Sequence, residues 1–400
     1  MASMTESLRP VPRWLHIWAV LAVVATFLLL AVGQMVTSFR AGMADPIWPT
    51  EPWYLASNFK LDLGYLIEHS HRIIGFSIGI IVSVLALGLL FGERCSATKW
   101  VSVVGVVVLL AGYGDFHGGL IAQRNVLPAD VKLPMRGAAT TLLGLTLALG
   151  ATAYGVAIRS RGAAIRLVGV AALAAVMTQG LLGGFRVMLH ELVGPDLATI
   201  HGIFAQVVFG LLVSLAVLTA RSVPELAASR KVRTGAVVLA VLLFVQVVWG
   251  ALVRHSPTIL TQKLHFLTAF LATGIAVWWL MCALYDPAAK SRVRLGAHFL
   301  SVLLLVQVYL GVEAWMEKFG QSIPWDLVPI TTHNAGIRTL HALIGSGLLA
   351  TALGLAVRVR QSATAPLPVT ETERDIRAEA GSSQPSLVAA NASQPGDSTA

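Results

Sequence analysis

The chain has 400 residues, of which 56% are hydrophobic and 12% are charged, and its mean hydropathy is +0.74. This composition excludes a soluble globular protein and indicates an integral membrane protein. The net charge of +9 does not indicate a nucleic-acid partner, because the basic residues form short clusters between apolar runs and do not follow one face.

Ten apolar segments are long enough to cross a bilayer, which takes about 20 helical residues. They predict membrane-spanning helices at 14–38, 67–91, 99–122, 137–158, 165–188, 198–220, 235–254, 263–285, 295–316 and 337–358. The first apolar run is too long for the core of a signal peptide and no small-residue cleavage site follows it, so we interpret it as a retained span.

The basic residues orient these helices, because Lys and Arg are enriched in cytoplasmic loops. The connections after the even-numbered helices are basic, through Arg94, Lys99, Arg159, Arg161, Arg166, Arg221, Arg230, Lys231, Arg233, Lys290, Arg292 and Arg294. We therefore expect a multi-pass protein of the cell inner (cytoplasmic) membrane, with residues 1–13 as a cytoplasmic N-terminus. Residues 361–400 are rich in Ser, Thr, Ala, Pro and Glu and predict a disordered cytoplasmic tail.

Four histidines lie within the first turns of four different even-numbered helices. They are His71, His201, His265 and His341. A single histidine near a membrane interface is often only a hydrogen-bonded side chain, but four at one depth indicate ligands. The two cysteines, Cys95 and Cys282, form no CxxC motif, so any metal has to be held by histidine. The pattern predicts two haems with two histidine ligands each.

A short repeat precedes three of these histidines. Gln-x-x-x-Gly stands at 179–183, 246–250 and 307–311, each time on the helix before the histidine. Glycine lets helices or a flat ring approach closely, and glutamine offers a hydrogen bond across helices. Ordinary packing of small residues is the alternative interpretation, but it does not explain why a histidine follows each time.

These motifs resemble the haem A synthase family, the membrane enzymes that convert haem O to haem A for terminal oxidases. The matching residues are 36–49 (VTSFRAGMADPIWP), Glu68-x-x-His71-Arg72, 179–184 (QGLLGG), His201, His265 and His341. The resemblance covers most of 14–91 and 164–358.

The resemblance implies an all-α membrane fold with two pseudo-symmetric four-helix bundles, each holding a haem between two histidines. The resemblance implies that His71 and His201 bind the substrate haem O, the precursor of haem A, in the N-terminal bundle (14–220). His265 and His341 bind haem b in the C-terminal bundle (235–358). The implied partners are haem O, supplied by the haem O synthase, and a membrane electron carrier. The sequence leaves open whether the chain forms a homo-oligomer.

Glu68 is the candidate catalytic residue. It lies three positions before His71 and shares a helix face with it. Oxidation of a methyl group to a formyl group removes electrons and protons from carbon, and a partly desolvated carboxylate suits proton acceptance. The alternative role of Glu68 is an ion pair with Arg72 at i, i+4.

The chain departs from the usual eight-helix pattern of the family, because residues 99–158 add two helices. His117 in this pair is either a ligand or proton relay, or an interface histidine paired with Asp115. His333, which we expect outside the last helix, is the alternative ligand to His341. We expect three further histidines to lie at the membrane interface without a ligand role, namely His190, His255 and His298.

Haem propionates are anionic, and four arginines near the outer interface are either their partners or plain membrane anchors. They are Arg72, Arg136, Arg254 and Arg338. The rival function is a multihaem b-type membrane cytochrome of the quinol or ferric reductase kind. Such proteins commonly place two histidines on one helix, whereas each helix here supplies one.

Overall fold

The structure is a computed structural model that describes residues 11–93, 95–127, 130–160, 162–220, 228–287 and 291–362. The described residues form helices and no strands, and ten of the helices are long and apolar enough to cross a membrane. The predicted all-α membrane fold is therefore confirmed. Residues 363–400, which make up most of the predicted tail, lie outside the described residues, as do residues 1–10.

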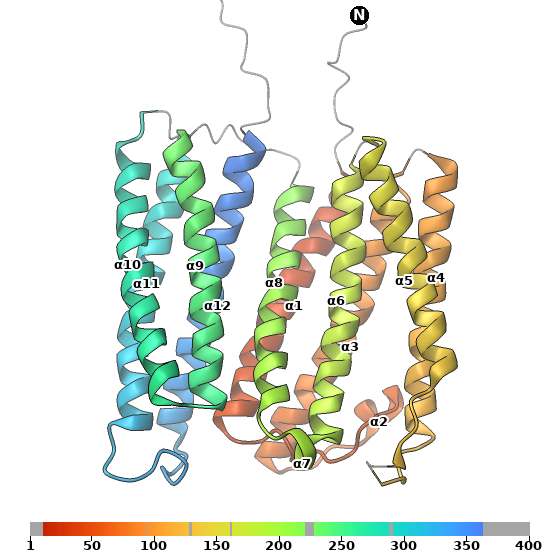
Figure 1. Cartoon of the computed structure of the whole chain (residues 1–400), viewed down its shortest axis with the longest axis horizontal. Helices are drawn as coiled ribbons and strands as arrows, with labels where there is room; N and C mark the ends of the chain where they lie inside the picture. Colours follow the sequence, from red (N-terminus) through yellow and green to blue (C-terminus); the bar gives the residue numbers. More distant parts are fainter. Residues whose placement is uncertain are drawn as a thin grey trace, which may run out of the picture. The chain divides into compact units, whose positions relative to one another are not determined.

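Each long helix overlaps one predicted segment. The ten are α1 (Arg13–Ser38), α3 (Leu63–Leu90), α4 (Ser96–Ile121), α5 (Met135–Ala157), α6 (Ala163–Met188), α8 (Asp196–Thr219), α9 (Arg230–His255), α10 (Ile259–Tyr285), α11 (Ser291–Phe319) and α12 (Thr332–Ser362). Two short helices, α2 (Pro52–Ser57) and α7 (His190–Val193), were not predicted. We call the end that carries α2 and α7, the lower end in Figure 1, the histidine end.

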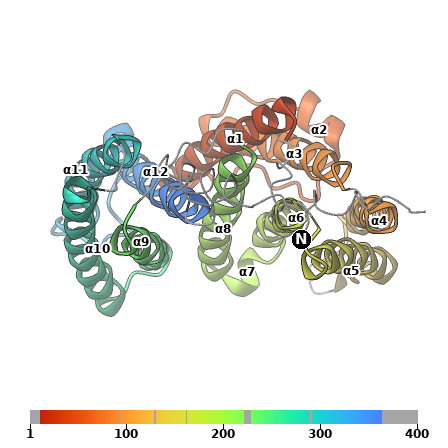
Figure 2. The same ribbon diagram turned by 90° about the horizontal axis from the view of Figure 1, so that it is seen from above.

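Two four-helix groups make up most of the described chain. In the N-terminal group, α1 and α6 each pack against both α3 and α8. In the C-terminal group, α9 and α11 each pack against both α10 and α12. Figures 1 and 2 show the two groups side by side, and α8 and α1 contact α12 where they meet. The helices α3 and α8 therefore stand at opposite corners of the first group, and α10 and α12 at opposite corners of the second.

The two added helices, α4 and α5, form a tight hairpin beside α6 and outside the N-terminal group (Figure 2). Glycines allow this close approach. A methyl group at Gly112 would overlap the backbone of Thr141, and one at Gly144 would overlap the backbone of Leu109. The extra pair thus leaves the four helices of the N-terminal group in contact with one another.

Local capping fixes the helix ends at the histidine end. The carboxylate of Asp62 accepts a hydrogen bond of 2.8 Å from the backbone N–H of Tyr65, so α3 begins four residues earlier than predicted. Thr331 and Asn334 bond each other's backbone N–H groups in the same way at the start of α12. His333 therefore lies inside the last helix, and the prediction that it precedes the helix is wrong.

The C-terminal end of α1 uses a left-handed turn at Arg40, whose φ is +52°. The N–H of Ala41 donates to the carbonyl of Val36 at 2.8 Å, and the N–H of Arg40 donates to that of Thr37 at 3.2 Å. These two bonds are the Schellman pattern, in which glycine usually takes the left-handed position. The turn ends α1 and begins the segment 41–62 at the histidine end.

Candidate functional site

The four predicted histidines form two pairs, one in each four-helix group. His71 on α3 and His201 on α8 have ring centroids 6.5 Å apart. His265 on α10 and His341 on α12 have ring centroids at the same separation, 6.5 Å. The members of each pair come from helices at opposite corners of their group, so each pair meets across the group's core.

A glycine on a neighbouring helix lies against each of the four imidazoles. A methyl group at Gly33 would lie 2.8 Å from Cε1 of His71, and one at Gly311 would lie 2.9 Å from Cε1 of His341. The corresponding distances are 3.0 Å for Gly183 with His201 and 3.2 Å for Gly250 with His265. Four imidazoles, each beside a glycine of the preceding spanning helix, are therefore a repeated structural unit.

The glutamine of each Gln-x-x-x-Gly repeat contacts the same histidine as the glycine. Nε2 of Gln179 lies 3.2 Å from Nδ1 of His201, and Nε2 of Gln246 lies 3.1 Å from Nδ1 of His265. Nε2 of Gln307 lies 3.5 Å from Nε2 of His341. The repeat found in the sequence is thus a set of contacts to the histidine that follows it.

The fourth unit escaped the sequence search because Leu29, and not glutamine, precedes Gly33 by four residues. Only the depth of Gly33 near the end of α1 could have revealed it. No glutamine faces His71, and its Nδ1 is buried without a hydrogen-bond partner. Nδ1 of His341 is also buried without a partner, although Gln307 lies near Nε2 of the same ring. A buried polar atom without a partner usually marks a group whose partner is missing or whose environment is incomplete.

The segment 179–184 joins the N-terminal pair to the extra helices. Gly183 faces His201, and its neighbour Gly184 lies so close to Trp48 that a methyl group there would overlap the indole ring. The ring of Trp48 also meets His117 of α4 edge-on, with ring centroids 5.9 Å apart. The added helices thus contact Trp48, which packs on Gly184 next to the glycine that faces His201.

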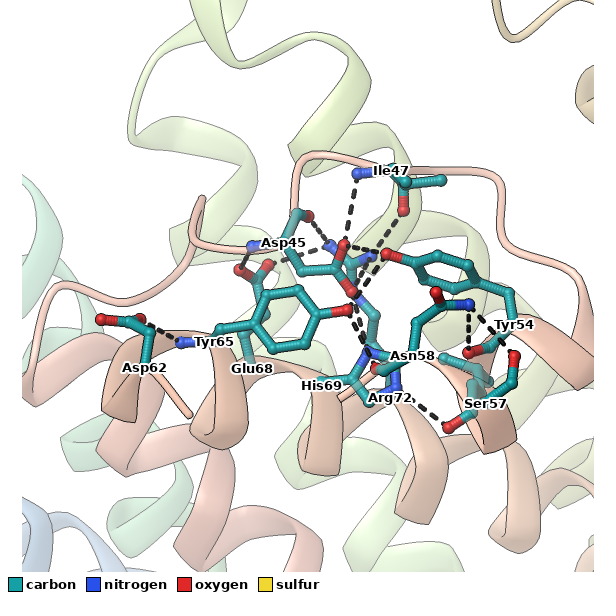
Figure 3. Close-up of polar contacts among 11 residues, drawn as sticks. Asp45, Ile47, Tyr54, Ser57, Asn58, Asp62, Tyr65, Glu68, His69 and Arg72 are labelled. Atoms are coloured by element: carbon teal, nitrogen blue, oxygen red, sulfur yellow. Dashed lines mark hydrogen bonds and ion pairs between the residues drawn. The ribbon is translucent and has the colours of Figure 1, made fainter. Parts of the chain in front are cut away.

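A buried polar cluster links the segment after α1 to the start of α3 (Figure 3). Asp45 is fully buried, and its Oδ2 lies 3.0 Å from Nδ1 of His69 and 3.2 Å from a guanidinium nitrogen of Arg72. The backbone N–H of Asp45 donates to Oε2 of Glu68 at 2.8 Å. His69, which sequence reasoning did not assign a role, is therefore part of this cluster and not of a histidine pair.

Aromatic side chains enclose this polar cluster. The imidazole of His69 stacks on Tyr65 at 5.1 Å and meets Phe59 edge-on at 5.3 Å between centroids. The hydroxyl of Tyr54 donates to Oδ1 of Asp45 at 3.1 Å. Burial and the hydrogen bond to Tyr65 raise the pKa of Tyr54 far above its usual value, so this hydroxyl stays a donor.

Both carboxylate oxygens of Glu68 have partners. Oε1 accepts from Arg72 at 3.0 Å, which is the predicted i, i+4 ion pair, and Oε2 accepts from the backbone of Asp45. Arg72 also donates to the carbonyls of Asp45 and Ile47, at 2.5 and 2.6 Å. These contacts tie the segment 41–62 to α3, and the catalytic role of Glu68 stays a prediction.

Other candidate residues lie apart from the two pairs. Nε2 of His117 donates to the carbonyl of Thr50 at 3.2 Å, while Asp115 pairs with Arg136, so the expected partnership of His117 with Asp115 is wrong. The side chain of His333 is 72% exposed and lies 3.8 Å from Glu317. Arg136 is 89% exposed on α5, which lies outside both four-helix groups.

The donor set restricts what the pairs can bind. Within the described part of the chain, no group of three or more His, Cys, Asp or Glu side chains is arranged to hold a metal ion. A metal held by either pair would therefore take two imidazole ligands and complete its coordination from a non-protein ligand. No protein-family model, curated protein or solved structure matches the chain, so the residues and their placement are the basis for a function.

Proposed function

We propose that this chain is a haem A synthase, a membrane oxidoreductase of cytochrome oxidase assembly that oxidises the methyl group of haem O to a formyl group. The observation that carries the proposal is the repeated histidine pair, with ring centroids 6.5 Å apart in both four-helix groups. The resemblance of 36–49, Glu68-x-x-His71-Arg72 and 179–184 to that family supports the same reaction.

The spacing of each pair fits a haem iron. Haem iron takes an axial ligand on each face of the porphyrin. Two imidazoles bound to one metal ion through nitrogens about 2 Å from it have ring centroids roughly 6 Å apart. The separation of 6.5 Å in each pair is close to this value without movement of either helix.

The two pairs differ in their surroundings, and this difference supports assigning haem O to His71 and His201. Glu68 lies three residues before His71, whereas the equivalent positions before His265 and His341 are Gln262 and Arg338. Only the N-terminal pair has a carboxylate at this place to accept protons from the substrate. We therefore assign haem b, as an electron relay, to His265 and His341.

The chain's own residues would act in three ways. His71 and His201 would hold the iron of haem O. Asp45 and Arg72 hold Glu68 in one orientation, and His69 in turn contacts the carboxylate of Asp45. Haem b, when bound, supplies a one-electron carrier, and a membrane electron carrier would exchange electrons with it.

The rival proposal is a b-type membrane cytochrome, which the equal spacing of the two pairs also fits. Extraction and chromatography of the haems from protein purified after co-expression with a haem O synthase separates the two. A synthase yields haem B together with haem O, its hydroxylated form or haem A. Haem B alone would reject the synthase in favour of the cytochrome, and no haem would reject both.

We also propose that both termini lie in the cytoplasm and that the histidine end faces outward. Ten spans place the start of α1 and the end of α12 on one side of the membrane, and Arg159 and Arg233 lie near other helix ends on that side. A reporter fused after Arg358 should be active only in the cytoplasm. Activity on the outer side would overturn this orientation.

A further inference from the structure

Basic side chains from both four-helix groups converge at the histidine end, where the groups meet. Coulomb repulsion links Lys318 on α11 to Arg254 on α9 and Arg338 on α12, and links His255 on α9 to Arg186 on α6. We call this set the cationic cluster, and its members are Arg40, Arg186, Arg254, His255, Lys318 and Arg338. All except the exposed Arg40 are half-buried.

The hydrogen-bond acceptors of this cluster are largely neutral. The guanidinium of Arg254 donates to Oε1 and to the carbonyl of Gln34, at 2.5 and 2.9 Å, and to Oγ of Ser38 at 2.8 Å. The ammonium of Lys318 donates to the carbonyls of Val253 and Arg254, at 3.1 and 3.0 Å. These bonds place the cations but do not cancel their charge.

Arg338 has an unused donor. One of its terminal nitrogens donates to the carbonyl of Glu317 at 3.3 Å, while its Nε is buried and has no hydrogen-bond partner. Two carboxylates attract members of the cluster from a distance, Glu317 acting on Arg338 and Glu68 acting on Arg186. Glu68 is itself paired with Arg72, and Glu317 lies 3.8 Å from His333. Among the ion pairs of the described residues, none joins a carboxylate to Arg186, Arg254, Lys318 or Arg338.

Arg40 adds a further positive charge to the cluster, because its Coulomb repulsion reaches Lys318 and Arg338.

The cluster lies beside both histidine pairs. Gln34 follows Gly33, which faces His71, and Arg254 lies one helical turn after Gly250, which faces His265. The bond from Arg254 to Gln34 therefore connects the two sites directly. Coulomb interactions reach the imidazoles as well, from Arg186 to His201 and from Arg254 to His341.

Partly buried cations that outnumber the carboxylates near them are costly, so a ligand is expected to supply the remaining negative charge. We infer that the cationic cluster binds the propionate carboxylates of the porphyrins held by both histidine pairs, and that it serves the two sites as one shared anion site. This inference rests on the proposed binding of haem. It replaces Arg72 and Arg136, which are paired with Glu68 and Asp115, as propionate partners.

The test compares two probes that differ only in this charge. Full-length protein purified without haem is titrated with iron protoporphyrin IX and with its dimethyl ester, and the low-spin absorption reports binding at the histidines. Charge-assisted hydrogen bonds favour the free acid, so the wild type should bind it about 10-fold or more tightly than the ester. Arg338→Gln and Lys318→Gln should reduce this preference toward unity by weakening binding of the acid alone.

Two controls keep the outcome interpretable. Arg124→Gln removes a histidine-end arginine that lies near Glu51 and outside the cluster, and it should keep the full preference. Arg338→Lys retains the charge and should keep part of it, which covers the case in which Arg338→Gln fails to fold. Equal affinity of the wild type for acid and ester would overturn the shared anion site while leaving haem binding intact. Failure of both probes to give a low-spin spectrum would overturn the proposed function itself.

Discussion

Gly33 of α1 and His71 of α3 touch so closely that a methyl group at Gly33 would lie 2.8 Å from Cε1 of the imidazole. The ring is therefore held between α1 and the core of the N-terminal group. Since the same relationship recurs at Gly183, Gly250 and Gly311, the glycines set the position of all four imidazoles.

Gly33→Ala should displace the imidazole of His71 and weaken low-spin haem binding at the N-terminal pair by about 10-fold, because a misplaced ligand loses its optimal geometry. The overpacking should also cost about 1–3 kcal/mol of stability. Gly79→Ala on α3, the helix that carries His71, is the control, since a methyl group there meets open space. If both variants bound haem like the wild type, the glycine contact would have no role in placing the ligand.

His265→Ala and His341→Ala should each remove the low-spin b-type spectrum of the C-terminal pair, because one imidazole cannot complete both axial positions. The spectrum of the N-terminal pair should persist in both variants. His333→Ala should leave both spectra unchanged, since its side chain is 72% exposed. Persistence of the b-type spectrum in both single variants, or its loss in His333→Ala, would refute the ligand assignment.

The bilayer explains why the spans and the histidines could be predicted from the sequence. A span of fixed thickness sets the length of each apolar run, so all ten helices were found. The alternation of the spans then placed His201 and His265 at one depth on different helices. Which histidines pair was implied only by the family resemblance, and the structure brings these same two pairs together.

Contacts made by loops could not be predicted in this way. Asp45 reaches His69 and Arg72 across a segment that contains no repeat, so spacing along the chain gives no sign of the pairing. The start of α12 was misplaced because the caps at Thr331 and Asn334 extend the helix into polar sequence. Hydropathy locates the apolar part of a helix and not its capped ends.

Asp45→Asn should strongly destabilise the N-terminal group, because it removes the buried negative charge that faces Arg72 and changes the hydrogen-bond partner of His69. Breaking one partner of a buried ion pair costs about 3–5 kcal/mol. Thermal unfolding in detergent measures the loss, and proteolysis of the segment 41–62 should become faster. Asp62→Asn is the control, since asparagine caps a helix as well as aspartate does; equal stability of the two variants would contradict a structural role for Asp45.

Glu68→Gln distinguishes a catalytic carboxylate from a structural one. Glutamine has one acceptor oxygen, so it keeps the hydrogen bond from Arg72 or the one from the backbone N–H of Asp45 and loses the other, and it cannot take a proton. Some stability should be lost, while haem occupancy should persist and turnover should fall about 100-fold or more. Haem O or its hydroxylated form should then accumulate in cells that co-express the haem O supply. A normal yield of haem A would reject the catalytic role, and loss of all bound haem would show that Glu68 only maintains the structure.

The most direct test of the central claim is the fate of haem O on the purified wild-type protein. Protein loaded with haem O and haem b is incubated in air with a chemical electron donor and, separately, with an electron acceptor, and the haems are extracted and quantified over time. The account predicts that haem O declines, that a hydroxylated form appears first, and that haem A follows, while haem B stays constant. Recovery of haem O unchanged under both conditions, with both histidine pairs occupied, would contradict it.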